Sequence, residues 1–180
     1  MLAGVLWACW LGAGQTPVVV ASQGKANVEI VVAAGAGPAE RYAAEELAKF
    51  LGQITGATFV VREIADGKDS PSPSVLVGGA AKGLFSAEEL GRLGPEDYRC
   101  RTKGGSLGIV GGSPRGTLYG VYSLLEDELG CRWFTPTVSR IPRKETASIG
   151  PLDRTFRPRL EYRSTDYPNS RDGDWAARNK

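Results

Sequence analysis

The sequence predicts an α/β (α+β) fold in which a mixed β-sheet carries two long helices packed on it. Two observations support this prediction. Residues 38–55 and 114–129 each place apolar side chains at the spacing of one helix face. Short apolar or alternating runs of strand length lie around these two segments. At 180 residues, the chain can bury one core and part of a second domain.

The first predicted unit is a strand, a helix and a second strand. Residues 27–33 (NVEIVVA) alternate and then become apolar, and Pro38 opens the helix after a glycine break. The apolar stripe of this helix comprises Ala43, Leu47, Phe50, Leu51 and Ile54. With a strand at residues 58–64, the pattern indicates a βαβ unit or a related crossover.

The middle of the chain predicts a short strand at residues 75–77, a short helix at 86–93 and then a hairpin. Residues 98–103 alternate with a period of two, and Gly104-Gly105 joins them to an apolar strand that begins at Ser106. The outer face of this hairpin carries Arg99, Arg101 and Lys103. These cations would either attract an acidic sugar or form a solvated sheet surface.

The most informative stretch is GGSPRGTLYGVYSLLEDELGCRWF, residues 111–134. It predicts a helix that Ser113 caps, Pro114 starts and Gly130 ends. The buried face of this helix comprises Leu118, Val121, Tyr122, Leu125 and Leu129. The helix dipole is opposed by Arg115 in the first turn and by Glu126, Asp127 and Glu128 in the last. These groups either have tertiary partners, Arg132 among them, or are screened by solvent.

A glycine turn between a strand and a helix also raises a nucleotide-binding hypothesis. Residues 111–116 (GGSPRG) lack the central glycine of G-x-G-x-x-G, because Ser113 occupies that position. They also lack the Lys-Ser/Thr pair of a P-loop, and Pro114 removes one N–H donor from the start of the helix. A nucleotide-binding α/β protein is therefore the weakest of our functional hypotheses, and we predict no cofactor.

Composition excludes several kinds of chemistry. The chain contains no histidine, so it cannot hold a Ser-His-Asp triad or a histidine zinc site. A net charge of +2 without long basic runs argues against a nucleic-acid partner. The three cysteines form no C-x-x-C pair, so their spacing does not predict a metal site. We expect Cys100 and Cys131 to be two buried free thiols rather than a disulfide, while Cys9 lies in the apolar leader.

The ends of the chain lead to separate expectations. Residues 1–22 predict an apolar leader, either a signal peptide or an N-terminal strand or arm, and its apolar run is too short to span a bilayer. A signal peptide would make the protein extracellular or periplasmic. We expect residues 23–150 to form the domain, with residues 132–149 closing its sheet. Residues 151–158 have the composition of a linker, and residues 159–180 would begin a second domain with a strand and a helix at 174–179.

Several segments in this order resemble the N-terminal domain that precedes the catalytic barrel in bacterial α-glucuronidases and β-N-acetylhexosaminidases. They are AERYAAEELAKFLGQITG, VLVGG, GIVGG and RGTLYGVYSLLEDELGCRWFTP. RPRLEYR is similar to the start of the first strand of the (β/α)8 barrel, so the resemblance implies a barrel truncated in this chain. It also implies that Arg163 binds substrate hydroxyls and that the catalytic carboxylates lie beyond Lys180. No residue of the chain is then catalytic.

We therefore expect a non-catalytic accessory domain of a secreted, carbohydrate-active protein of the glycoside hydrolase type. Its partners would be its own C-terminal barrel and a carbohydrate substrate. Trp133 and Phe134 would anchor the face between the domains or stack on a sugar. A stand-alone carbohydrate-binding module is the first alternative. Whether the full protein is an active O-glycosyl hydrolase is left open by the sequence.

Overall fold

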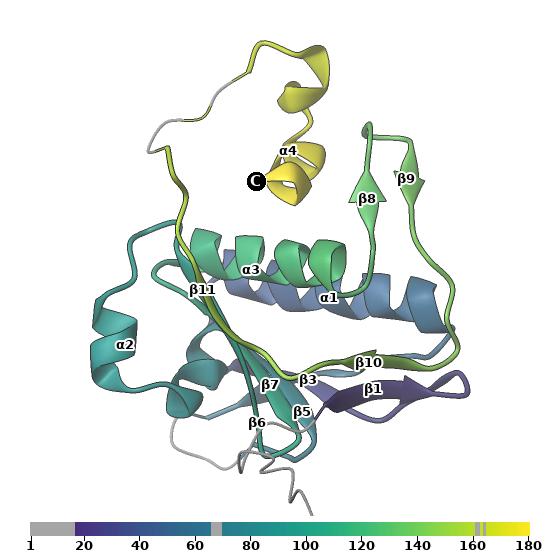
Figure 1. Cartoon of the computed structure of the whole chain (residues 1–180), viewed down its shortest axis with the longest axis vertical. Helices are drawn as coiled ribbons and strands as arrows, with labels where there is room; N and C mark the ends of the chain where they lie inside the picture. Colours follow the sequence, from purple (N-terminus) through teal and green to yellow (C-terminus); the bar gives the residue numbers. More distant parts are fainter. Residues whose placement is uncertain (1–16, 66–69, 161–162, 164) are drawn as a thin grey trace, which may run out of the picture.

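The computed structural model describes residues 17–65, 70–160, 163 and 165–180 (Figure 1). A six-stranded mixed sheet with two long helices on one face forms its centre, which confirms the predicted fold class. The elements in chain order are β1 (Val18–Ser22), β2 (Lys25–Ala26), β3 (Glu29–Ala33), α1 (Pro38–Thr55), β4 (Val61–Ile64), β5 (Ser74–Val77), η1 (Gly78–Leu84), α2 (Ala87–Gly91), β6 (Tyr98–Lys103), β7 (Ser106–Gly111), α3 (Pro114–Asp127), β8 (Arg132–Trp133), β9 (Ser139–Arg140), β10 (Ala147–Ile149), β11 (Asp153–Phe156), η2 (Pro168–Arg171) and α4 (Gly173–Asn179).

The strand order of the central sheet is β11-β6-β7-β5-β3-β4. The four strands β4, β3, β5 and β7 are parallel, whereas β6 pairs antiparallel with β7 and β11 pairs antiparallel with β6. The β3-α1-β4 unit is the predicted βαβ crossover, with Ile30 opposite Val61. The predicted hairpin is also confirmed, with Lys103 opposite Ser106 next to the Gly104-Gly105 turn.

Side-chain alternation along the strands builds two hydrophobic layers. Ile30 and Val32 point to the face that α1 and α3 cover, where they join the larger core. Val31 points to the opposite face and packs in a smaller cluster with residues of η1 and α2. The apolar face predicted for residues 114–129, from Leu118 to Leu129, is buried as expected, although α3 itself ends at Asp127. The sheet is therefore covered on both sides, as a largely parallel sheet requires.

The domain begins earlier than the sequence analysis places it. β1 pairs with β10 and β2 in a separate three-stranded sheet, and Val18, Val20 and Ala21 are buried. These residues, predicted as the end of the leader, belong to the fold because their apolar side chains reach the core. Residues 1–16 lie outside the described residues, and the signal-peptide prediction lies there with them.

Two further expectations are wrong. The segment 132–149 does not close the central sheet, since β8 pairs with β9 and β10 pairs with β1. The predicted linker at 151–158 contains β11, which forms an edge of the central sheet. Pairing with β6 explains the strand: Asp153 lies opposite Arg101, and the rings of Phe156 and Tyr98 stack with centroids 5.0 Å apart.

The C-terminal segment is folded against the domain. The helix predicted at 174–179 is α4, and the side chain of Asp172 caps it by accepting from the backbone N–H of Trp175 at 2.7 Å. The predicted barrel strand around 160–163 falls largely on residues 161 and 162, outside the described residues. Within the described residues, no helix has both the length and the apolar character needed to cross a membrane.

Cys100 and Cys131 are both buried and free, as predicted. Burial raises the pKa of the Cys100 thiol to about 12 and that of the Cys131 thiol to about 11. Both thiols are therefore protonated near neutral pH and serve as small core residues.

Candidate functional site

The glycine turn between β7 and α3 does not leave room for a phosphate. The N–H of Gly111 donates to Thr117 Oγ1 at 3.0 Å, and the N–H of Gly112 donates to the carbonyl of Asp97 at 3.0 Å. A Cβ atom on Gly112 would lie 2.1 Å from the carbonyl oxygen of Gly94. The glycines therefore allow close packing of two backbone segments, and the donors that a phosphate would need already have partners. This geometry argues against the nucleotide hypothesis.

Two of the three cations on β6 are paired with carboxylates. The guanidinium groups of Arg99 and Arg101 each contact Glu89 (2.8 and 2.7 Å) and Asp153 (3.0 and 2.9 Å). The hydrogen bond from Arg101 is the main cause that lowers the pKa of Glu89 to about 2. Arg99 and Arg101 are thus neither free for an acidic sugar nor a solvated row, because α2 and β11 supply two carboxylates. Lys103 alone remains exposed.

The unfavourable charges of α3 have tertiary partners, as one of the two alternatives predicted. Arg115 pairs with Glu96 at 3.2 Å, and Glu126 contacts Lys180 at 2.6 Å and Arg132 at 3.9 Å. Arg154 on β11 reaches both Asp127 and Glu128 at 3.2 Å. Arg132 is therefore only one of the partners of these carboxylates, and their shorter ion pairs are with Arg154 on β11 and Lys180 at the end of the C-terminal segment.

A buried carboxylate joins three helices. Glu46 on α1 has a side chain only 4% exposed, and it accepts hydrogen bonds from Tyr122 Oη on α3 at 3.0 Å and from Arg178 on α4 at 2.8 Å (Nη2) and 3.0 Å (Nε). Lys49 Nζ lies 2.7 Å from its other oxygen. Burial beside Glu46 raises the pKa of Tyr122, so this hydroxyl stays a proton donor. The Glu46 cluster (Glu46, Lys49, Tyr122 and Arg178) therefore fixes α4 on the two long helices.

Sequence reasoning missed the Glu46 cluster, although a signal was present. Glu46 follows Ala43 by three residues and precedes Phe50 by four, which places it on the apolar stripe of α1. A charge at such a position predicts a buried partner, but the partner, Arg178, is 132 residues away.

Trp133 and Phe134 have different environments. Trp133 is buried in the core of this domain, where its ring packs edge-to-face on Phe50 at 5.2 Å and on Tyr122 at 5.6 Å. Its backbone carbonyl accepts from the indole N–H of Trp175 at 3.0 Å. Phe134 is 59% exposed. Trp133 is thus used inside the domain, and only Phe134 is free to meet another domain or a sugar.

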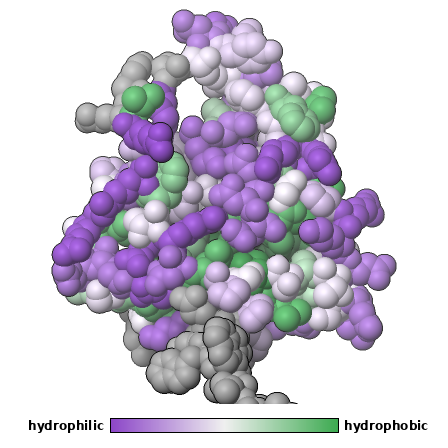
Figure 2. All heavy atoms as spheres, in the orientation of Figure 1, coloured by the Kyte–Doolittle hydropathy of each residue, from purple (hydrophilic) through white to green (hydrophobic). Residues whose placement is uncertain are grey.

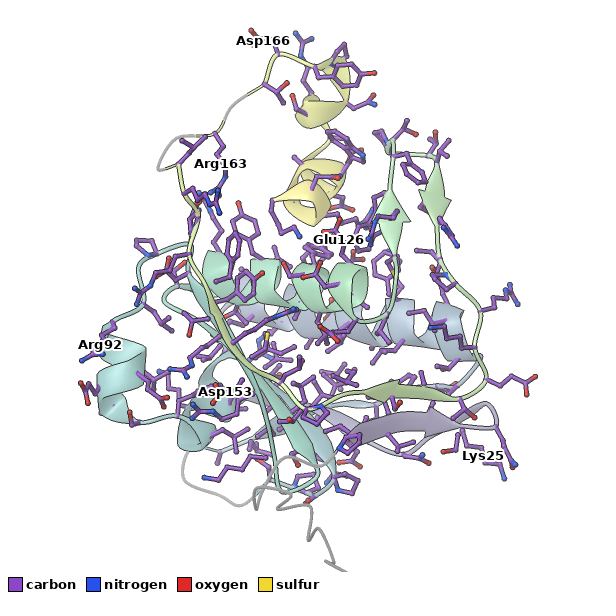
Figure 3. The ribbon with its side chains drawn as sticks, in the orientation of Figure 1. Lys25, Arg92, Glu126, Asp153, Arg163 and Asp166 are labelled. Atoms are coloured by element: carbon purple, nitrogen blue, oxygen red, sulfur yellow. The ribbon has the colours of Figure 1, made fainter. Side chains whose placement is uncertain are left out.

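The predicted substrate contact, Arg163, lies at a groove of about 440 Å³ between α3, α4 and the end of β11 (Figure 3). Its guanidinium pairs with Glu96 and donates to the carbonyl of Leu160 at 3.3 Å. The groove is lined by Tyr98, Tyr119, Ser123, Asp127, Phe156, Pro158, Arg159, Leu160, Arg163, Asn179 and Lys180. Aromatic rings, hydroxyl groups and cations together suit a polar ligand such as a sugar.

Among the described residues, the groove is lined by a single carboxylate. Glycoside hydrolysis normally uses two carboxylates on either side of the bond, and Asp127 is the only one among the described residues that line the groove. Asp127 also pairs with Arg154. In the described part of the chain there is no group of three or more His, Cys, Asp or Glu side chains that could hold a metal ion.

The fold is that of an N-terminal domain of the kind found in glycoside hydrolases. Residues 9–124 match the family described as "Glycosyl hydrolase family 67 N-terminus". The chain belongs to this family. A comparison with curated proteins gave no match.

Solved structures with a similar fold include a family GH115 4-O-methyl-α-glucuronidase with specificity for decorated arabinogalactans. It is 19% identical, with a TM-score of 0.55, over 80% of this chain and 19% of its own. A mutant Streptomyces plicatus β-hexosaminidase in complex with its product GlcNAc is 16% identical, with a TM-score of 0.46, over 78% of this chain and 23% of its own. The chain thus spans about a fifth of the length of these structures.

Proposed function

We propose that this chain is an accessory domain that precedes and supports a catalytic barrel in a secreted glycan-degrading protein. The Glu46 cluster is the observation that carries the proposal. Because it fixes α4 to α1 and α3, the rest of a barrel that begins within residues 159–180 would continue from a rigid helix rather than from a flexible linker. A rigid exit sets the position of the second domain.

An exposed apolar face supports the same proposal. Of the seven large hydrophobic side chains exposed in the described residues, five follow Gly130 in sequence: Phe134, Val138, Phe156, Leu160 and Tyr167. Figure 2 shows hydrophobic atoms at the tip of the β8–β9 hairpin, which extends beside α4 in Figure 1. Phe134 and Val138 lie side by side in this hairpin, since the N–H of Phe134 donates to the carbonyl of Val138 at 3.0 Å, and exposed apolar residues that gather in this way are typical of an interaction surface. We propose that the barrel packs on this face.

The variants Phe134→Ser and Tyr167→Ser test this packing. Both side chains are about 60% exposed (59% and 60%), so in the 180-residue chain each change should alter stability by no more than about 0.5 kcal/mol. In the full-length protein each should lower the melting temperature by at least about 2 °C, because the residue would be buried there. Val60→Ser is the control, since Val60 is 56% exposed beside β4, at the opposite edge of the sheet from β11.

The result that contradicts the proposal is an equal effect of all three variants in the full-length protein. That result would favour the stand-alone carbohydrate-binding module, in which this face has no partner. Calorimetric unfolding of the 180-residue chain and the full-length protein, with each variant, distinguishes the two.

We propose Arg163 as the contact of this segment with the sugar. Its place at the groove supports this role, and Glu96 holds its guanidinium in the described structure. Arg163→Ala in the full-length protein should raise KM for the glycan while leaving the melting temperature unchanged within about 1 °C, because an exposed ion pair contributes little to stability. An unchanged KM would remove Arg163 from the substrate site.

Secretion is part of the proposal and is supported by the apolar sequence of residues 1–13. Expression of the intact reading frame in a bacterium, followed by N-terminal sequencing of the exported protein, tests it. Cleavage before Val18, the first residue of β1, is expected. Retention of Met1 in the exported or the cytoplasmic protein would contradict a cleaved signal peptide.

A further inference from the structure

The glycine-rich segment GGSPRG, residues 111–116, packs against a neighbouring turn, GPED, residues 94–97. A Cβ atom on Gly112 would lie 2.1 Å from a carbonyl oxygen of this turn, and a Cβ atom on Gly116 would lie 2.4 Å from another. Glycine is the residue that allows two backbone segments to approach so closely. The most informative stretch of the sequence therefore receives a turn of the protein itself at its start.

Hydrogen bonds fix the turn in this place. The N–H of Gly112 donates to the carbonyl of Asp97 at 3.0 Å. The hydroxyl of Ser113 donates to the carbonyl of Pro95. Within the turn, the N–H of Gly94 donates to Asp97 Oδ2 at 3.0 Å. The residue between Pro95 and Asp97 is thus held by bonds on both sides, and its side chain starts from a fixed backbone.

That residue is Glu96, and its carboxylate joins two arginines. Oε1 lies 3.2 Å from Arg115 Nη1, and Oε2 contacts Arg163 Nη2. Arg115 belongs to the glycine-rich segment, whereas Arg163 comes from the chain between β11 and α4 (Figure 3). Because each oxygen has its own arginine, Arg115 orients the carboxylate that Arg163 meets. The side chains of Glu96 and Arg163 are 25% and 31% exposed, so their attraction is screened less than that of a fully exposed pair.

The other contact of Arg163 is local. Its Nη1 donates at 3.3 Å to the carbonyl of Leu160, three residues earlier. Among the described residues, Glu96 provides the only ion pair of Arg163. Arg159 lines the same groove and is exposed, and it has no ion pair with a carboxylate of the described residues. The two arginines therefore differ in whether the body of the domain holds them.

We propose that Glu96 is the positioning residue of Arg163, and that the glycine-rich segment seats the turn that presents Glu96. This inference deepens the proposed function and rests on the role proposed there for Arg163. Glu96 acts through Arg163 and does not itself touch the sugar. A long side chain that is held before the ligand arrives loses less freedom on binding, so the domain prepares a substrate contact that lies outside its own sheet.

The first test measures the reactivity of Arg163 in the intact 180-residue chain. Phenylglyoxal modifies guanidinium groups, and peptide mass spectrometry gives the rate at each arginine. Glu96→Gln keeps the size of the side chain and removes its charge, so we expect Arg163 to react at least about fivefold faster, whereas Arg159 should react at an unchanged rate. The matched control is Glu88→Gln, which removes the partner of Arg92 in an exposed pair and should not affect Arg163.

A spectroscopic measurement separates positioning from a general loss of structure. In nitrogen-15 NMR spectra, rotation of the Arg163 guanidinium should be slow in the unchanged chain and fast in Glu96→Gln, while the backbone amide signals of α3 keep their positions.

Ser113→Ala tests the glycine-rich segment separately. It removes the hydrogen bond to the carbonyl of Pro95 without changing any charge. We expect Arg163 to react about twofold faster in this variant, because the turn that carries Glu96 is held less firmly. Circular dichroism spectra confirm that each variant is folded.

Three results would overturn the proposal. They are an unchanged rate at Arg163 in Glu96→Gln, an equal rise in Glu88→Gln, and an unchanged rate in Ser113→Ala. None of these measurements needs a substrate. Their failure is therefore distinguishable from a failure of the role proposed for Arg163, which the KM of Arg163→Ala tests.

Discussion

Removal of Arg178 tests how strongly the Glu46 cluster holds α4. In Arg178→Ala the carboxylate of Glu46 stays buried, with a 4% exposed side chain, and loses two hydrogen bonds of 2.8 and 3.0 Å. Loss of one partner of a buried ion pair typically costs about 3–5 kcal/mol. Here Lys49 and Tyr122 still contact Glu46, so we expect a smaller loss of about 2–3 kcal/mol in the free energy of unfolding.

The control is Arg62→Ala. Arg62 pairs with Glu29 at 2.7 Å, but its side chain is 55% exposed, so its loss should cost no more than about 1 kcal/mol. Urea denaturation followed by circular dichroism gives both values from the midpoint and slope of each transition. In a double-mutant cycle with Glu46→Gln, the coupling between residues 46 and 178 should be about 1–2 kcal/mol. A loss in Arg178→Ala no larger than that in Arg62→Ala, or a coupling near zero, would refute the reasoning.

Three other predictions follow from the same structure. Gly112→Ala should lower the free energy of unfolding, measured by urea denaturation, by about 2–3 kcal/mol, because its Cβ would lie 2.1 Å from the carbonyl oxygen of Gly94. Gly35→Ala, whose Cβ would have nothing within 4 Å, should be nearly neutral. Equal effects of the two variants would contradict the close backbone packing at Gly112. The pKa of Glu89 is about 2 in the folded protein and 4.5 in the unfolded reference. The ionised carboxylate therefore contributes fully to the stability of the folded protein above about pH 5, and this contribution is lost as the pH falls toward 2. Glu89→Gln should therefore lower the melting temperature at pH 7 but not at pH 2, and an equal loss at both values would contradict this. In a Cys9→Ser variant, iodoacetamide at pH 8 should label neither Cys100 nor Cys131 until the chain is unfolded; rapid labelling of the folded protein would contradict their burial.

The sequence predicted the elements whose side-chain period is set locally. The stripes of α1 and α3 and the alternation of β6 recur at fixed spacing, so their buried faces could be named from residues alone. Gly104 and Gly105 have φ values of 58° and 77°, in the left-handed region that the predicted hairpin turn requires.

Elements that depend on distant partners were missed. β11 lies between proline- and glycine-containing stretches with the composition of a linker, and it is a strand because Asp153 and Phe156 meet Arg101 and Tyr98 on β6. β1 was assigned to the leader because its apolar residues continue the composition of that segment, and pairing with β10 makes it part of the fold.

The candidate site was predicted only in part. Arg163 was named from the family resemblance, and the structure places it at a groove whose other walls come from α3 and α4. Arg178 could not be named, because its role depends on a carboxylate that lies 132 residues earlier in the chain. The sequence predicts that the charges on α3 have tertiary partners, but it does not identify Arg154 and Lys180 as those partners. Both residues are distant in sequence and are brought to α3 only by the fold.

Hydrogen exchange of backbone amides tests the central claim most directly, that the face around α4 receives a following domain. The measurement compares the 180-residue chain with the full-length protein over the β8–β9 hairpin, residues 132–140, and over residues 165–171. We predict that exchange in both segments slows at least about tenfold in the full-length protein, while exchange in β4, at the far edge of the sheet, stays the same. Equal exchange of the two segments in both proteins would contradict the account.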